Sequence, residues 1–156
     1  MAKGPYQIDK WDENYENYKS RDIDACRYVC VPNKQDGSSM TYILSLKDGA
    51  TIYGIWHLIL GTASRQARPR AGWMTDTGKP DGAPWTLAGM AVRWRRTETE
   101  VKRALEVLGS PSVGWIKYPS GIRSVPVQYP RSTRSVSVRY PRIEGKGREG
   151  NRKENG

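Results

Sequence analysis

Apolar side chains recur at the period of an α-helix in the middle of the chain. The pattern predicts a helix over residues 48–66, in which Asp48 caps the first turn by accepting a hydrogen bond from a free amide. Arg68-Pro69 ends this helix, because the residue before a proline is disfavoured in the helical conformation. The single histidine, His57, is expected beside the apolar stripe as a boundary residue. The stripe consists of Ile52, Ile55, Trp56, Ile59 and Leu60.

Two short amphipathic helices follow, and both carry cap signals. Thr86 precedes the first, and Thr97 precedes the second, where Glu100 completes a capping box. Gly109 ends the second helix. The segment between them, Trp94-Arg95-Arg96, has about the length of the turn in a helix-turn-helix. The apolar faces are Leu87, Met90, Ala91 and Trp94 on the first helix, and Val101, Ala104, Leu105 and Leu108 on the second.

Runs rich in β-forming residues predict strands before the helices. Strands are expected at Arg27–Val31 and Met40–Leu46, because Pro32–Gly37 between them supplies turn residues. A further short strand is expected at Gly72–Thr75.

A hairpin is expected after the second short helix. Residues 113–118 alternate at period two, and Tyr118-Pro119-Ser120-Gly121 has the signature of a type I turn. Ile122–Val127 can return as the partner strand. A hairpin at this place in the order of elements is typical of the wing of a winged helix.

These elements predict an α+β fold. The expected arrangement is a winged helix-turn-helix domain over 21–128, with a β-containing N-terminal extension. Residues 1–20 are an N-terminal arm, or a short helix packed by its aromatic side chains. Residues 129–156 are expected to be a disordered basic tail, since they are Gly-rich and poor in apolar groups. The alternative is an ordered extension of the wing, because Tyr-Pro repeats at Tyr118, Tyr129 and Tyr140 continue into the tail.

Charge is concentrated in the second half of the chain. The net charge is +10, from 26 Lys and Arg against 16 Asp and Glu. Residues 1–85 hold 11 basic and 10 acidic residues, whereas residues 86–156 hold 15 and 6, so the net charges are +1 and +9. Such an asymmetry favours nucleic acid as a partner, although a solubilising tail would also produce it.

Several function classes are disfavoured by what the chain contains. No apolar run reaches the roughly 20 residues of a spanning helix, and no secretory signal opens the chain, so no membrane association and a cytoplasmic location are expected. Cys26 and Cys30 lack further ligands and are expected to be reduced and metal-free. No paired acids or nucleophile–base set is visible, so we expect no enzyme activity, no catalytic residues and no cofactor. The six Trp residues are spread singly, which favours core packing over a base-stacking platform.

The strongest candidate for function is therefore a surface that binds double-stranded DNA. The second helix of such a motif enters the major groove, where basic and hydroxyl side chains contact phosphates and bases. Protein contacts and RNA binding remain alternatives, because Glu98 and Glu106 on the same helix would repel phosphate. The candidate DNA-binding residues are Arg93, Arg95, Arg96, Thr97, Thr99, Lys102, Arg103, Lys117, Arg123, Arg131, Arg134 and Arg139.

A set of short motifs also resembles a family of uncharacterised phage and prophage proteins. The resemblance is carried by Trp11, Tyr15-Glu16-Asn17, Ser20-Arg21, Val31-Pro32-Asn33-Lys34, Asp36-Gly37, Gly54-Ile55-Trp56 and Gly114-Trp115-Ile116. Members resemble the N-terminal winged-helix domains of replisome-organiser proteins. The resemblance implies a non-enzymatic role in initiating phage DNA replication inside a bacterial host, with origin DNA and a replicative helicase or its loader as partners. A transcriptional regulator and a protein-interaction adaptor are the alternatives, and the oligomeric state stays open.

Overall fold

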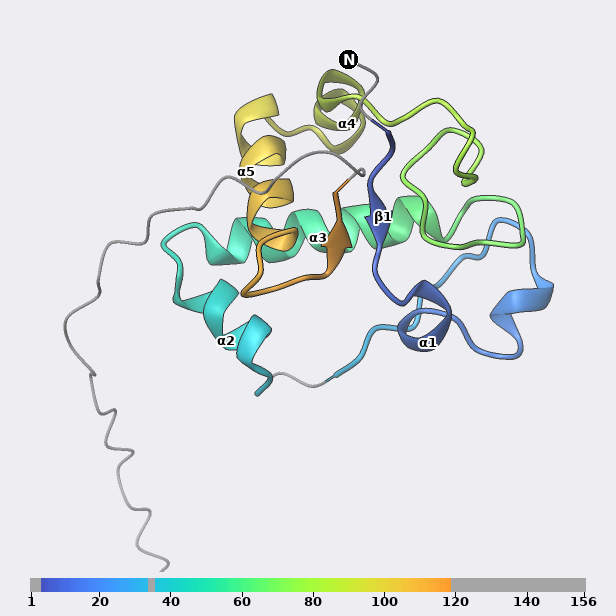
Figure 1. Cartoon of the computed structure of the whole chain (residues 1–156), viewed down its shortest axis with the longest axis horizontal. Helices are drawn as coiled ribbons and strands as arrows, with labels where there is room; N and C mark the ends of the chain where they lie inside the picture. Colours follow the sequence, from blue (N-terminus) through green and yellow to red (C-terminus); the bar gives the residue numbers. More distant parts are fainter. Residues whose placement is uncertain (1–3, 34–35, 119–156) are drawn as a thin grey trace, which may run out of the picture. The chain divides into compact units, whose positions relative to one another are not determined.

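A computed structural model describes residues 4–33 and 36–118, which form a mixed helical and β structure (Figure 1). The predicted α+β class is confirmed. Within these residues, no helix is both long and apolar enough to cross a membrane. The expected strand at 122–127 and the tail at 129–156 lie outside the described residues. In chain order the elements are β1 (Gln7–Ile8), α1 (Trp11–Asn14), the 3-10 helix η1 (Ser20–Asp22), α2 (Ser38–Ser45), α3 (Gly49–Ala63), α4 (Leu87–Trp94), α5 (Glu98–Leu108) and β2 (Ile116–Lys117).

The long helix α3 confirms the helix predicted from the apolar stripe, and all five stripe residues are buried. It ends at Ala63, several residues before Arg68-Pro69, so the predicted stop is wrong. Asp48 stands at the N-cap position, but its carboxylate accepts no hydrogen bond from the first turn. It accepts one from Nε of Arg103 on α5 instead, at 3.1 Å. The predicted cap is therefore wrong, because the Asp48 carboxylate is paired with the guanidinium of Arg103 on another helix.

The two short helices α4 and α5 begin where their caps predict. The Thr86 hydroxyl accepts a hydrogen bond from the Gly89 amide at 3.0 Å. At α5 the Thr97 hydroxyl accepts from the Glu100 amide at 3.2 Å, and the Glu100 carboxylate accepts from the Thr97 amide at 2.9 Å. The capping box is confirmed, since both reciprocal bonds are present. These bonds hold the Glu100 carboxylate in its charged form and lower its pKa.

Replacing Thr97 with Ala is expected to lower the free energy of unfolding by about 1 kcal/mol, because the capped amide loses its partner. Denaturant unfolding followed by far-UV circular dichroism measures this change. Thr99→Ala is the matched control, since Thr99 is exposed and its hydroxyl has no hydrogen-bond partner in the described part of the chain. We expect the control to stay within about 0.5 kcal/mol of the unmodified protein. Equal losses in the two variants would contradict the capping role.

A small antiparallel sheet joins the two ends of the described chain. β1 pairs with β2 in the register Gln7↔Lys117 and Ile8↔Ile116. The other side of β1 contacts residues 72–74, where the Ile8 amide donates to the Gly72 carbonyl at 2.8 Å. In place of the predicted strand at Gly72–Thr75, only isolated bridges form, at Trp73 and Thr75. The N-terminal segment thus lies between residues 72–74 and β2, beside α3 (Figure 1).

Two further predicted strands, at Arg27–Val31 and Met40–Leu46, are also wrong. Met40–Leu46 lies mostly in helix α2, where Met40 and Ile43 are buried one helical turn apart. A short apolar run fits either structure, and packing of this face on α3 decides for the helix. Arg27–Val31 has no regular secondary structure, because its backbone meets no partner strand among the described residues.

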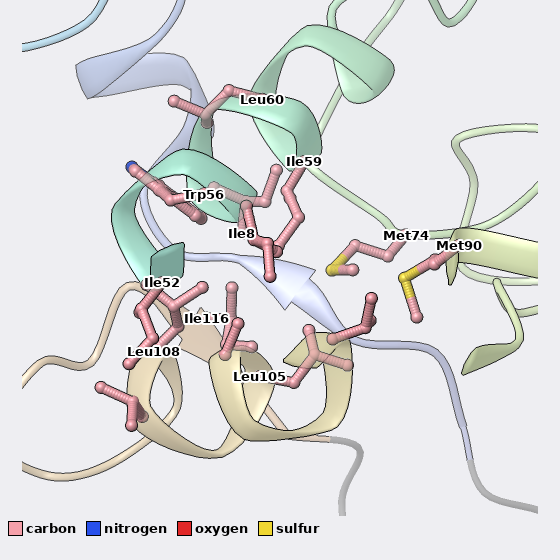
Figure 2. Packing of buried hydrophobic residues seen from close by; sticks show 14 of the residues in the cluster. Ile8, Ile52, Trp56, Ile59, Leu60, Met74, Met90, Leu105, Leu108 and Ile116 are labelled. Carbon is pink, nitrogen blue, oxygen red and sulfur yellow. The ribbon is translucent and has the colours of Figure 1, made fainter. Parts of the chain in front are cut away.

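One hydrophobic core connects these elements. Figure 2 shows Ile8 of β1 and Ile116 of β2 lying between Trp56 of α3 and Leu105 of α5. The N-terminal segment contributes Trp11 and Tyr15, both buried. Of the two interpretations of residues 1–20, the short helix packed by aromatics is therefore the one that the described residues support.

A buried ion pair between Glu16 and Arg70 links the segment after α1 to the loop after α3. Arg70 Nε lies 2.5 Å from a Glu16 carboxylate oxygen, and the two side chains are 1% and 4% exposed. The Arg70 guanidinium also donates to the carbonyls of Ser20 and Ile23. Glu16 accepts further bonds from Trp11 Nε1 and the Ser20 hydroxyl. Both charges are thus compensated by hydrogen bonds inside the protein, as a buried pair requires.

Candidate nucleic-acid interface

The turn between α4 and α5 is held in one conformation by its backbone. Arg95 adopts the left-handed conformation, with φ 55° and ψ 49°. The Arg96 amide donates to the Ala91 carbonyl at 2.9 Å, which is the closing bond of a Schellman motif. Glycine is the usual residue at this position, because a Cβ is strained there. Because glycine would avoid this strain, an arginine at the position indicates that the exposed side chain itself has a role.

Four basic side chains project from this region into solvent. Arg93 lies in the last turn of α4, Arg95 and Arg96 form the turn, and Lys102 lies on the outer face of α5. All four are exposed, and none makes an ion pair within the described residues. Thr99, also exposed, adds a free hydroxyl on the first turn of α5. The structure brings these five predicted residues together on α4, the turn and α5, and we call them the α4–α5 surface.

Three other predicted residues have partners inside the protein. The Thr97 hydroxyl is part of the capping box and already accepts a hydrogen bond from the Glu100 amide. Arg103 is half-buried and pairs with Asp48 at 3.1 Å. Lys117 Nζ lies 2.6 Å from an Asp9 carboxylate oxygen. These contacts position α5 and β2, and the charges of Arg103 and Lys117 are partly neutralised.

The remaining predicted DNA-binding residues are arginines that follow β2 in the sequence. They lie outside the described residues and are Arg123, Arg131, Arg134 and Arg139.

Acidic groups limit what the α4–α5 surface can bind. Glu98 is exposed at the start of α5, and Glu106 is half-buried near its end. Glu100 faces back into the cap and is engaged with Thr97. The first turn of α5 thus carries the exposed Glu98 carboxylate and no cation, while Arg95 and Arg96 precede it and Lys102 follows it. Phosphate contacts are favoured at the turn, whereas Lys102 lies one helical turn from Glu98 on the same face of α5.

No group of three or more metal-ligating side chains occurs in the described part of the chain. Cys26 and Cys30 are both free thiols, the first buried and the second half-buried. The Cys30 sulfur accepts a hydrogen bond from the side-chain amide of Asn17, with 3.1 Å between Nδ2 and Sγ. His57 is exposed and meets the ring of Tyr53 edge-on, at 4.6 Å between centroids.

Sequence reasoning missed the acids that neutralise two of the predicted cations. Asp48 and Asp9 are far from Arg103 and Lys117 along the chain, and a lone carboxylate carries no signal of its distant partner. It also missed a small pocket of about 170 Å³ beside Arg93, lined in part by Trp85 and Trp94. The pocket was hidden because an isolated Trp in a helical stripe usually indicates core. Comparison of the chain with family models, with curated proteins and with solved structures finds no match.

Proposed function

We propose that this protein is a non-enzymatic binder of double-stranded DNA that uses the α4–α5 surface. The carrying observation is that Arg93, Arg95, Arg96 and Lys102 are exposed, lack ion-pair partners in the described residues, and gather at one helix–turn–helix. Cations that are not paired internally are free to displace counterions from phosphates.

The order of elements supports a winged-helix arrangement of this surface. α3, α4 and α5 would be its three helices, with β2 as the first wing strand and α5 as the recognition helix. β1 pairs with β2 and so occupies one edge of that strand. In this arrangement the turn would lie over the sugar–phosphate backbone, while Thr99 and Lys102 would reach base edges.

The sequence resemblance to replisome-organiser domains makes initiation of phage or prophage replication the proposed setting. A replicative helicase or its loader is the second proposed partner. Transcriptional regulation would use the same surface. A protein-interaction adaptor is favoured by one observation, namely that Val92 is 81% exposed on α4, next to Arg93.

Salt dependence of duplex binding tests the proposal. In a titration of labelled duplex followed by fluorescence anisotropy, affinity should fall steeply with salt, with a log–log slope of roughly −3 to −4 if the four cations each contact a phosphate. An adaptor with an apolar interface would bind its protein partner almost independently of salt, and would bind duplex weakly or not at all. A flat salt response, or no binding at low salt, would overturn the proposal.

Arg95→Gly is expected to stabilise the protein and weaken DNA binding at once. Glycine relieves the left-handed strain, so the free energy of unfolding should rise by about 0.5–1 kcal/mol. Loss of the side chain should make the salt slope shallower by about 0.9. Arg95→Ala is the control, because it removes the same charge but keeps the strained Cβ. Thermal unfolding and duplex titration separate the two effects, and an unchanged slope in both variants would exclude Arg95 from the interface.

A further inference from the structure

A cavity of about 320 Å³ is lined by no residue of α4, the turn or α5. Its walls come from Asp9, the end of α1, residues 31–32, the first turn of α2, the N-terminal half of α3 and residues 114–115 before β2. The volume is within the range of small-molecule sites, about 300–1,000 Å³. The cavity shares no residue with the α4–α5 surface, so the two sites can be tested separately. The lining residues used below are Asp9, Tyr15, Ser38, Ser39, Tyr53, Trp56 and Trp115.

Aromatic rings form one side of the cavity. Trp56 and Trp115 lie 5.2 Å apart between centroids, tilted by 40°. Tyr15 meets Trp56 edge-on at 5.7 Å. Trp56 is buried, whereas Tyr53 and Trp115 are only half-buried and keep surface free toward solvent. The wall therefore offers aromatic surface to a flat ligand.

The hydroxyl of a largely buried tyrosine, Tyr15, lines the same cavity without a partner among the described residues. Tyr15 is only 6% exposed, and its hydroxyl makes no hydrogen bond in the described residues. The only fully enclosed side-chain polar atom without a partner in those residues is Gln66 Oε1, so the Tyr15 hydroxyl keeps some access to the cavity. Burial and the nearby Asp9 carboxylate raise the pKa of Tyr15, which keeps the hydroxyl protonated and able to donate.

The start of α2 contributes backbone donors to the same cavity. Gly37 is the N-cap residue, and no side chain caps this helix. The Ser39 hydroxyl does not cap the helix and instead donates to the carbonyls of Ser112 and Val113. No hydrogen bond from the amides of Ser38 and Ser39 forms within the described residues, so these amides are available to an acceptor. Asp9 is paired with Lys117, so its negative charge is offset.

We propose that this cavity binds a single unpaired nucleobase, supplied either by a free nucleotide or by a single DNA strand. The inference rests on the proposed DNA-binding function and adds a second site to it. A base has a flat face to stack on Trp115 and Tyr53 and carries both donors and acceptors on its edge. Those edge groups match the Tyr15 hydroxyl and the α2 amides. An aliphatic or phenyl side chain would leave these polar groups unpaired.

The test follows the indole N–H signals of the intact protein by ¹H–¹⁵N NMR. The probes are deoxyadenosine monophosphate, a short oligodeoxyadenylate and, as the rival ligand, N-acetyltyrosinamide. Of the six Trp signals, we expect those of Trp56 and Trp115 to shift with both nucleotide probes. Shifts with the oligonucleotide alone would also support the site and would assign its ligand to a single strand.

Tyr15→Phe removes only the hydroxyl and should weaken nucleotide binding about 3- to 10-fold, the usual effect of one hydrogen bond. Its melting temperature should not fall, since the hydroxyl has no hydrogen-bond partner among the residues that the structure describes. Tyr18→Phe is the matched control, because Tyr18 is 75% exposed and lies outside the cavity. Both variants should keep the duplex affinity and salt slope of the unmodified protein.

Three outcomes would overturn the cavity proposal. They are no shift at Trp56 and Trp115, shifts with N-acetyltyrosinamide only, and equal nucleotide affinity in Tyr15→Phe and the unmodified protein. Failure of the α4–α5 proposal gives a different result. Duplex binding would then be absent or independent of salt, while the nucleotide-induced shifts would remain.

Discussion

Changing Arg95, Arg96 and Lys102 together to Glu is expected to lower duplex affinity by at least about 10²-fold at roughly 0.15 M salt. Each lost phosphate contact removes about 0.9 from the salt slope, and the new carboxylates add repulsion. Helicity should be retained, because all three side chains are exposed and make no ion pair in the described residues. Arg103 is left unchanged, since it pairs with Asp48 and its reversal would also loosen α5 from α3.

A second triple variant separates position from net charge. Lys47, Arg65 and Lys79 are exposed, make no ion pair within the described residues and lie outside α4 and α5. Changing them to Glu alters the net charge by the same amount. We expect this control to lose far less affinity than the first variant. Equal losses in anisotropy titrations would show that only the overall charge matters, and the α4–α5 surface would no longer be supported.

Arg70→Met is expected to destabilise the protein by about 3–5 kcal/mol, because it leaves the Glu16 carboxylate buried without its cation. The double variant Arg70→Met with Glu16→Gln should recover much of the loss, since no uncompensated charge remains. Arg68 supplies the control, because its contact with Asp24 is exposed and Arg68→Met should cost at most about 1 kcal/mol. Urea unfolding measures all three, and an Arg70→Met protein as stable as the Arg68 control would contradict the role of the pair.

The same ion pair predicts how stability changes with pH. Burial raises the pKa of Glu16, but hydrogen bonds from Arg70, Ser20 and Trp11 outweigh it and hold the pKa below its usual value. A depressed folded pKa means that the stabilisation is complete above the unfolded value of about 4.3 and is lost as pH falls through the folded value. Urea unfolding between about pH 5 and pH 2 should show this loss in the unmodified protein. The double variant should show a weaker dependence on pH.

Local signals in the sequence were sufficient for the three main helices. The stripe from Ile52 to Leu60 has only the helical period, and Thr86 and Thr97 carry cap chemistry that acts within three residues. The exposed position of Lys102 followed from the same periodicity, and that of Arg95 and Arg96 from the predicted turn between the two helices. These features are local, so neighbours along the chain decide them.

The remaining features depended on residues far apart in the sequence. Met40–Leu46 is compatible with strand or helix, and only its packing on α3 makes it helical. β2 pairs with β1, which lies at the other end of the described chain. No turn signal in the sequence predicts this pairing, because the two strands are not joined by a hairpin. Arg103 is paired with a carboxylate 55 residues away, which turns a predicted DNA contact into an internal one.

The aromatic cavity shows the same division. Composition and periodicity identified Trp56 and Trp115 as buried or half-buried side chains, and they are. The start of α2 and the Tyr15 hydroxyl, which has no hydrogen-bond partner among the described residues, lie beside them only because distant segments of the chain pack together. Helix periodicity and caps are properties of short segments, so the sequence by itself determined α3, α4 and α5. Ion pairs, strand partners and cavities need groups that the folded chain brings together, so only the tertiary structure decided them.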